Sequence, residues 1–453
     1  MTVPDLIPLC PSTDLDAVVA WQPQGPRRLR DLLADAHALA RCLPPGGHLL
    51  NVCQDRYRFA VGFVAGLIDG RVSLQPSSQS AETLHRIRST YPDVVCLADA
   101  AFDSQGLPCV VFPQALEVRP LADARVPAWP ADRLVAVLFT SGSTGLPQAH
   151  GKTWGRLVQN GRVEARRLGL LERPHGIVGT VPVQHSYGFE STFLMALQSG
   201  SAFWSGKPFY PQDVVTALER MPEPRLLVTT PFHLSTLLAS DLTLPSTALL
   251  LSATAPLSGH LASQAEARFG APVHEIYGST ESGQLASRRT TEGAPWTLLD
   301  GVELQGGPEG TVATGGHVEG RVPLSDLIES LPGGRFLLHG RHADLVNIAG
   351  KRTSLAYLNH QIGAVPGVVD AAFFLPDEAE HDASGTTRLC AFAVAPGLTR
   401  DVLLGQLRSR VDPVFLPRPL VLLDALPRNS TGKLTREALK ALYAAWRASQ
   451  GVR

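Results

Sequence analysis

The segment Leu138-Phe-Thr-Ser-Gly-Ser-Thr-Gly-Leu-Pro147 decides the fold, because it joins an apolar run, residues 134–139, to a turn rich in glycine and hydroxyl side chains. The apolar run predicts a buried strand. Phosphate oxygens need many donors at close approach, and such a turn offers backbone N–H groups together with hydroxyls. The predicted phosphate-binding residues are Thr140, Ser141, Gly142, Ser143, Thr144 and Gly145. The competing interpretation is a surface linker, although linkers seldom follow a core strand.

A second phosphate-binding pattern, that of the P-loop nucleotide triphosphatases, is nearly matched just downstream. The pattern is G-x-x-x-x-G-K-[ST], and here five residues rather than four separate Gly145 from Gly151-Lys152-Thr153. The match fails by one residue. A P-loop enzyme would release ADP, so this alternative has a distinct product.

Short apolar runs alternate with segments of helical period on both sides of the turn. Strands are expected at residues 49–53, 72–75, 94–97, 177–181, 202–204, 226–230, 248–251 and 273–277. Helices are expected at 31–41, 211–220, 232–239 and 260–269. This alternation predicts an α/β fold in which parallel-rich sheets are covered by helices.

The pattern changes after about residue 333. A strand at 336–339 is followed by helices at 354–363, 400–411 and 435–447 and by strands at 368–374, 389–394 and 420–423. We therefore expect a large amino-terminal domain, residues 1–341, and a small α+β carboxy-terminal domain, residues 342–453.

Composition excludes several classes of protein. With 40 basic and 41 acidic residues the formal charge is −1, which gives no general attraction for a nucleic-acid backbone. The six cysteines form no C-x-x-C pair, so neither a disulfide framework nor a zinc site is indicated. No apolar run is long enough for a membrane span, and the amino terminus does not look like a signal peptide. We expect a cytoplasmic protein.

Two further clusters carry chemistry. In Glu275-Ile-Tyr-Gly-Ser-Thr-Glu-Ser-Gly283, the carboxylate of Glu281 lies beside the hydroxyls of Ser279 and Thr280, a set that can hold Mg²⁺ against a phosphate. The alternative is a solvated loop carboxylate. In Leu426-Pro-Arg-Asn-Ser-Thr-Gly-Lys-Leu-Thr-Arg436, Lys433 precedes the last predicted helix, where a surface cation is the simpler interpretation from composition alone.

These motifs, in this order, resemble the adenylate-forming superfamily of acyl-CoA synthetases, peptide-synthetase adenylation domains and luciferases. The matching elements are Thr-Ser-Gly-Ser-Thr-Gly-x-Pro, Tyr-Gly-x-Thr-Glu, Gly-Arg and Pro-Arg-Asn-x-Thr-Gly-Lys. The resemblance implies a mobile carboxy-terminal domain and two half-reactions. A carboxylate and MgATP give acyl-AMP and pyrophosphate, and a thiol then takes the acyl group.

The resemblance also implies roles for single residues. Residues 140–145 would bind pyrophosphate, Tyr277 and Gly278 would border the adenine, and Thr280 would bond the α-phosphate. Glu281 would bind Mg²⁺, Asp326 in Leu324-Ser-Asp-Leu327 would bond the ribose hydroxyls, and Arg341 would contact the nucleotide. Lys433 would bridge the two anions that react, the carboxylate and the α-phosphate.

Two positions depart from the family pattern. Gln148 stands where a lysine commonly follows the phosphate loop, so one cation is missing unless Lys152 or protonated His150 replaces it. Ala343 stands at the usual hinge position, which leaves the hinge residue open. Because of both departures, a catalytically silent nucleotide- or carrier-binding relative stays an alternative.

The acid and the acceptor are suggested by finer features. His185-Ser-Tyr-Gly-Phe-Glu190 is similar to the segment that borders the acyl pocket, which makes His185 and Tyr187 pocket candidates; Ser279, outside this segment, is a third. His185 could equally belong to the core, and a core position is favoured for Tyr187 because aromatic residues at this spacing usually pack in cores. The phosphate loop comes early in the chain, which favours a small acid. The carboxy-terminal segments resemble the ligases of aryl-polyene and xanthomonadin pigment pathways, which implies 4-hydroxybenzoate as the acid and an acyl carrier protein as the acceptor. Free coenzyme A is the alternative acceptor. Residues 342–453 hold 13 Lys/Arg and 10 Asp/Glu, and this net charge of +3 suits an acidic carrier.

Overall fold

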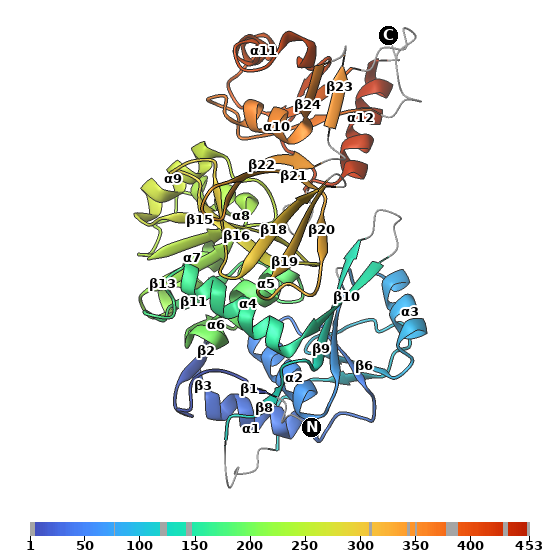
Figure 1. The fold of residues 1–453 in the computed structure, drawn as a ribbon, viewed down its shortest axis with the longest axis vertical. Helices are drawn as coiled ribbons and strands as arrows, with labels where there is room; N and C mark the ends of the chain where they lie inside the picture. Colours follow the sequence, from blue (N-terminus) through green and yellow to red (C-terminus); the bar gives the residue numbers. More distant parts are fainter. Residues whose placement is uncertain are drawn as a thin grey trace.

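The computed structural model describes residues 5–76, 78–117, 125–141, 147–307, 310–341, 345–348, 351–376, 388–428 and 434–450. The chain runs from its amino terminus at one end of the long axis to its last helix at the other (Figure 1). Most of the described strands up to Arg341 belong to two large sheets. In the part of the chain that is described, no helix has the length and apolar character needed to cross a membrane.

The first large sheet carries the segment that opened the sequence analysis. Its order is β10 (Pro147–Thr153), β9 (Leu134–Ser141), β5 (Val72–Gln75), β4 (His48–Asn51), β6 (Val94–Ala98) and β7 (Cys109–Val111). All neighbours are parallel except β10 and β9, which form an antiparallel hairpin. The predicted strand at 134–139 is confirmed and extends to Ser141.

The second large sheet has eleven strands. Their order is β21 (Asp326–Leu331), β22 (Arg335–Arg341), β17 (Trp296–Leu298), β16 (Gly283–Arg289), β15 (Val273–Ser279), β14 (Leu249–Ser252), β13 (Arg225–Thr229), β11 (Gly176–Gly179), β12 (Ala202–Trp204), β2 (Val18–Gln22) and β3 (Gly25–Arg28). The run from β15 to β2 is parallel, as the strand–helix alternation predicted, and β15 then turns back antiparallel into β16.

Smaller sheets complete the large part of the chain. One joins β18 (Val302–Gly307), β19 (Gly310–Gly315) and β20 (Val322–Leu324), and another joins β1 (Leu6–Pro8) and β8 (Ala128–Pro130). The helices are α1 (Leu29–Ala40), α2 (Arg56–Ile68), α3 (Ala81–Thr90), α4 (Trp154–Arg167), α5 (Ser186–Gly188), α6 (Met195–Ser199), α7 (Pro211–Arg220), α8 (Pro231–Leu238) and α9 (Gly259–Phe269). The four helices predicted here are confirmed, with ends shifted by one or two residues at most.

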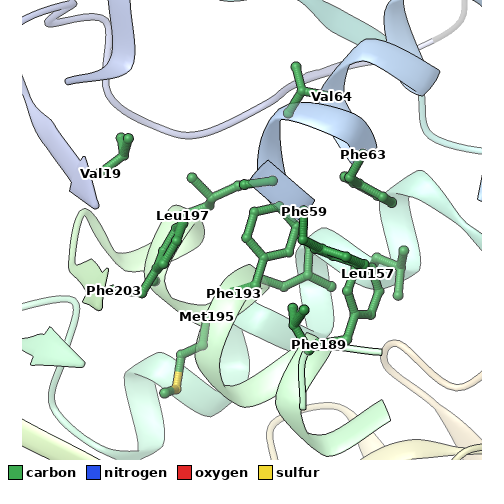
Figure 2. Packing of buried hydrophobic residues seen from close by; sticks show 14 of the residues in the cluster. Val19, Phe59, Phe63, Val64, Leu157, Phe189, Phe193, Met195, Leu197 and Phe203 are labelled. Carbon is green, nitrogen blue, oxygen red and sulfur yellow. The ribbon is translucent and has the colours of Figure 1, made fainter. Parts of the chain in front are cut away.

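An aromatic cluster locks α2 against a π-helical turn, η1 (Phe189–Leu194), as Figure 2 shows. Phe63 of α2 meets Phe189 and Phe193 edge-on, with ring centroids 5.3 and 5.6 Å apart. Such pairs stabilise a core beyond their burial alone. The segment that was expected to border the acyl pocket is therefore fixed from behind by the core.

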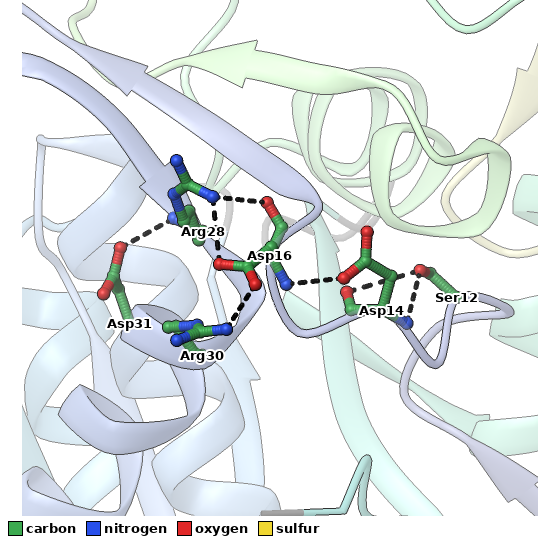
Figure 3. A network of polar contacts seen from close by, with 6 residues as sticks. All are labelled: Ser12, Asp14, Asp16, Arg28, Arg30 and Asp31. Carbon is green, nitrogen blue, oxygen red and sulfur yellow. Dashed lines mark hydrogen bonds and ion pairs between the residues drawn. The ribbon is translucent and has the colours of Figure 1, made fainter.

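A network of surface hydrogen bonds and ion pairs lies beside β3, the edge strand of the second sheet (Figure 3). Arg28 and Arg30 both pair with Asp16, and the backbone N–H of Arg28 donates to Asp31 at 2.8 Å, which caps the start of α1. These exposed ion pairs hold a bend in place and contribute little net stability.

The chain after residue 344 forms sheets and cores of its own. Its elements are β23 (Leu345–Ile348), β24 (Lys351–Ser354), α10 (Leu355–Gly363), β25 (Asp370–Phe374), β26 (Cys390–Val394), α11 (Arg400–Arg408), β27 (Leu420–Leu422) and α12 (Arg436–Gln450). They lie at one end of the molecule beside β21 and β22 (Figure 1). The mixture of helices and strands predicted for this part of the chain is confirmed. Helix α11 ends at Arg408, whereas the prediction placed its end at 411.

Candidate active site

The hairpin β9–β10 presents a row of polar side chains. In this hairpin Gln148 pairs with Thr140, and Gln148, His150 and Lys152 share one face of β10 because side chains alternate along a strand. His150 Nε2 lies 3.1 Å from the hydroxyl of Thr140. Ser141 ends β9, and the predicted phosphate-binding residues 142–145 lie outside the described residues.

The carboxylate of Glu281 faces this hairpin. Its Oε1 lies 3.7 Å from His150 Nε2, and its side chain keeps 35% of its surface exposed. Burial opposes ionisation, but hydrogen bonds from Ser279 and Thr140 and the nearby His150 outweigh it, so the pKa of Glu281 lies below its usual value. Burial in turn lowers the pKa of His150, with Glu281 opposing. The site thus holds an imidazole and a carboxylate beside hydroxyl groups.

Thr280 connects this carboxylate to the segment expected to border the acid. Its hydroxyl lies 3.2 Å from that of Ser186, which opens α5. The Nδ1 atom of His185 accepts a hydrogen bond from the backbone N–H of Tyr187 at 3.2 Å. Tyr187 is buried and donates its hydroxyl to the carbonyl of Leu251 at 2.9 Å. The segment 185–187 therefore lies directly against the loop that carries Glu281.

The turn at Gly188 is tightly packed. A Cβ atom at this position would lie 2.2 Å from the carbonyl oxygen of Pro182, a distance that no side chain tolerates. Glycine is therefore required where α5 passes into η1.

Tyr277 and Asp326 form the other side of the site. The Tyr277 hydroxyl donates to Oδ2 of Asp326 at 2.8 Å, and its ring packs against Trp296 and Phe336 with centroids 5.7 and 5.6 Å away. Gly278, beside Tyr277, is exposed. In the antiparallel ladder between β21 and β22, the backbone of Asp326 lies opposite that of Arg341.

The structure therefore brings together most of the predicted site residues that it describes. Thr140, Ser279, Thr280 and Glu281 are linked through contacts at the strand ends, and Tyr277 continues β15 toward Asp326. Lys433 and Ala343 lie outside the described residues, as does the side chain of Arg341.

A family model described as "AMP-binding enzyme" matches residues 48–306, more than half of the 453-residue chain. The chain belongs to this family.

Relatives of this AMP-binding enzyme include a 4-coumarate–CoA ligase of Rhodobacter capsulatus, 28% identical over 305 residues, with 66% of this chain and 74% of the relative covered. A 4-chlorobenzoate–CoA ligase of an Arthrobacter species is 26% identical over 363 residues, with 69% and 67% covered. ATP-bound MatB from Rhodopseudomonas palustris superposes with a TM-score of 0.80 at 19% identity, covering 95% of this chain and 96% of that one. A benzoate CoA ligase from Burkholderia xenovorans gives 0.77 at 19% identity, covering 94% and 96%. The structural neighbours support the predicted fold. The family model and the relatives support the prediction of an AMP-forming ligase that uses ATP.

The structure excludes the P-loop alternative for this AMP-binding enzyme. Gly151, Lys152 and Thr153 belong to strand β10, and Lys152 is only 4% exposed. Its ammonium group donates to the backbone carbonyl of Glu281 at 2.8 Å. A P-loop lysine would instead stand on a loop and reach a bound phosphate. For the same reason Lys152 is not the free cation that would replace the lysine missing at Gln148.

A buried polar cluster beneath the Glu281 loop was not found by sequence reasoning. Its members are Lys152, Asn160, Glu164, Glu190, Ser191, Gln284 and His317. Burial raises the pKa of Glu190 to about 7, with Lys152 opposing, and raises that of Glu164 to about 8. Burial lowers the pKa of His317 to about 4. A signal was present, since Asn160 and Glu164 stand one helical turn apart on the apolar face of α4, where polar residues are unusual.

Proposed function

We propose that this enzyme adenylates a small aromatic carboxylic acid with ATP and then transfers the acyl group to the phosphopantetheine thiol of an acyl carrier protein. The acid we favour is 4-hydroxybenzoate. The observation that carries the proposal is the junction at Thr280, which joins the Glu281 carboxylate and the Thr140 strand end on one side to Ser186 and the acid-pocket segment on the other.

In the first half-reaction, a carboxylate oxygen attacks the α-phosphorus of ATP, the bond to the bridging oxygen breaks, and pyrophosphate leaves. Thr280 would donate to an α-phosphate oxygen, and residues 140–145 would receive the pyrophosphate. Tyr277 would lie against adenine while Asp326 bonds the ribose hydroxyls. Lys433 would supply the cation between the two anions, which lowers the barrier where negative charge develops.

The residues present also fit a magnesium ion. Glu281 is ionised, partly exposed and surrounded by hydroxyl oxygens, and Mg²⁺ prefers one or two carboxylates together with phosphate oxygens. When bound, the ion would neutralise charge on the phosphates. Glu281 would hold it, with Ser279 and Thr140 keeping that carboxylate ionised and oriented.

In the second half-reaction, a thiolate attacks the acyl carbon and AMP leaves. The small domain, residues 342–453, would rotate between the two steps and remove Lys433 from the site. Its net charge of +3 favours an acidic carrier protein.

Free coenzyme A is the second candidate acceptor. It is favoured by the names of the relatives, which are 4-coumarate–CoA and 4-chlorobenzoate–CoA ligases. Both names contain an aryl acid, which supports the aromatic class of substrate for either acceptor.

The test is acid-dependent exchange of pyrophosphate into ATP over a panel of benzoates, cinnamates and fatty acids. The proposal expects a benzoate to give the fastest exchange, and AMP to be released once a thiol acceptor is supplied. The best acid is then offered to coenzyme A and to a pantetheinylated carrier, and a higher kcat/KM with the carrier supports our choice. Nucleotide binding without exchange for any acid would leave the silent relative as the correct interpretation.

A further inference from the structure

Residues 279–284, which run from the end of β15 through the turn that carries Glu281 to the start of β16, are called the Glu281 loop here; buried side chains hold this loop by hydrogen bonds. Lys152 donates to the carbonyl of Glu281 at 2.8 Å, and His317 Nε2 donates to the carbonyl of Gln284 at 2.6 Å. The side-chain amide of Gln284 donates to Glu190 Oε2 at 3.0 Å. These three hydrogen bonds come from different parts of the chain, so the underside of the loop is fixed as one unit.

Close packing accompanies these hydrogen bonds. Gly283 has φ +73°, and a Cβ atom there would lie 3.2 Å from Asn160 Nδ2 and 3.3 Å from His317 Cδ2. A side chain at 283 would therefore push the loop away from the cluster. Glycine both permits the left-handed conformation and lets the backbone lie on the polar side chains.

A small cavity lies within the cluster, lined in part by Lys152, Asn160, Glu190 and His317, with about 10 Å³ of free volume. Among the side chains that line this cavity, three buried atoms lack a hydrogen-bond partner in the described part of the chain, namely Asn160 Oδ1, Glu190 Oε1 and His317 Nδ1. The volume suits a single water molecule, which needs two or more polar partners of this kind. The cluster is therefore a polar support with room for one water molecule.

The burial of Lys152 in this cluster calls for a physical explanation. Moving an ammonium group out of water is costly, and an apolar side chain of similar volume would fill the space without that cost. Lys152 is only 4% exposed, and its ammonium group donates to the backbone carbonyl of Glu281. The carboxylate of the same Glu281 faces Thr140. A hydrogen bond from a charged donor is also shorter and stronger than one between neutral groups.

We propose that Lys152 is a positioning residue that holds the backbone of Glu281 so that its carboxylate is presented to a magnesium–nucleotide complex. This inference rests on the proposed function, because it assumes that Glu281 binds the metal. Lys152 acts through the carbonyl of Glu281 and touches no substrate. The near-match to a P-loop suggested that Lys152 contacts a phosphate directly. In this proposal it contributes to nucleotide binding indirectly, through Glu281.

The test is calorimetric binding to the full chain of MgATP and, separately, of AMP without magnesium. Lys152→Met should raise the Kd for MgATP about tenfold, the effect of losing one charged hydrogen bond, and leave the Kd for AMP unchanged. Lys152→Arg, which keeps the charge and the donor, should recover part of the loss. The control is Lys207→Met, which removes an exposed lysine placed outside this cluster and should change neither Kd.

The double variant Lys152→Met/Glu190→Gln removes the buried charges together, and it keeps the test valid if the single variant does not fold. It should show the same selective loss of MgATP affinity. An unchanged Kd for MgATP in a folded variant, or an equal rise for AMP, would overturn the proposal. Binding needs no acid, so wild type that binds MgATP without exchange for any acid would refute the proposed function and leave this test intact.

Discussion

The hydroxyl of Tyr277 donates a 2.8 Å hydrogen bond to Oδ2 of Asp326, so the residue proposed to border adenine orients the carboxylate proposed for the ribose. Tyr277→Phe should raise the KM for ATP about fivefold, the effect of losing one hydrogen bond, with little change in kcat. The measurement is pyrophosphate exchange against ATP concentration. With 2′-deoxy-ATP the difference between the variant and wild type should shrink; an equal difference with both nucleotides would contradict the ribose role.

Lys433→Ala should nearly abolish acyl-AMP formation, by roughly a hundredfold or more, because the cation between two anions is lost. Thiol transfer from chemically prepared acyl-AMP should be largely retained, since the lysine would by then have left the site. Single-turnover assays of the two steps provide the comparison. Equal loss in both steps would refute the assigned role.

Gln148→Lys should lower the KM for ATP about two- to fivefold, the range of an exposed charge interaction. The side chain at 148 is exposed and lies opposite Thr140 at the end of the hairpin, so a lysine there adds a cation beside the phosphate loop. Gln148→Met is the control for side-chain length. If the lysine leaves the KM unchanged, another group already neutralises the phosphates.

Glu164→Gln should change how stability depends on pH. Burial raises the pKa of Glu164 to about 8 in the folded protein, while Ser191 donates to its Oε1 at 2.6 Å. The folded state therefore binds a proton that the unfolded state releases near pH 4.5, so this contribution to stability is present at low pH and lost as the pH rises through about 8. Thermal unfolding from pH 5 to 9 should show wild type losing several degrees relative to the glutamine variant, which keeps an acceptor for Ser191. Parallel pH profiles would show that Glu164 does not titrate as proposed.

Much of the fold could be predicted because its signals are local. The strand at 134–139 and the helix at 211–220 follow from an apolar run and from a proline in the first helical turn, and both are confirmed. Helix α2 was not predicted, because it is apolar all round and buried, so it lacks the alternation of polar and apolar faces that marks a surface helix.

The candidate site divides in the same way. Glu281 and Thr140 were found because each follows a core strand within a recognisable motif. Glu190 and His317 were missed because their importance depends on contacts between distant segments, such as the hydrogen bond from Gln284 to Glu190. Lys152 was considered as a cation that could bind phosphate, but it is buried and so cannot fill that role. Whether a lysine in a strand is buried depends on which distant segments pack over it.

The pairing of Asp326 with Arg341 has a practical consequence for engineering. A chimaera spliced after residue 341 would exchange the carboxy-terminal unit with that of a related ligase and leave the β21–β22 ladder whole. Under the proposed function, the chimaera would take its preference for a thiol acceptor from the donor ligase, while Asp326, proposed to bond the ribose, would keep its native strand partner.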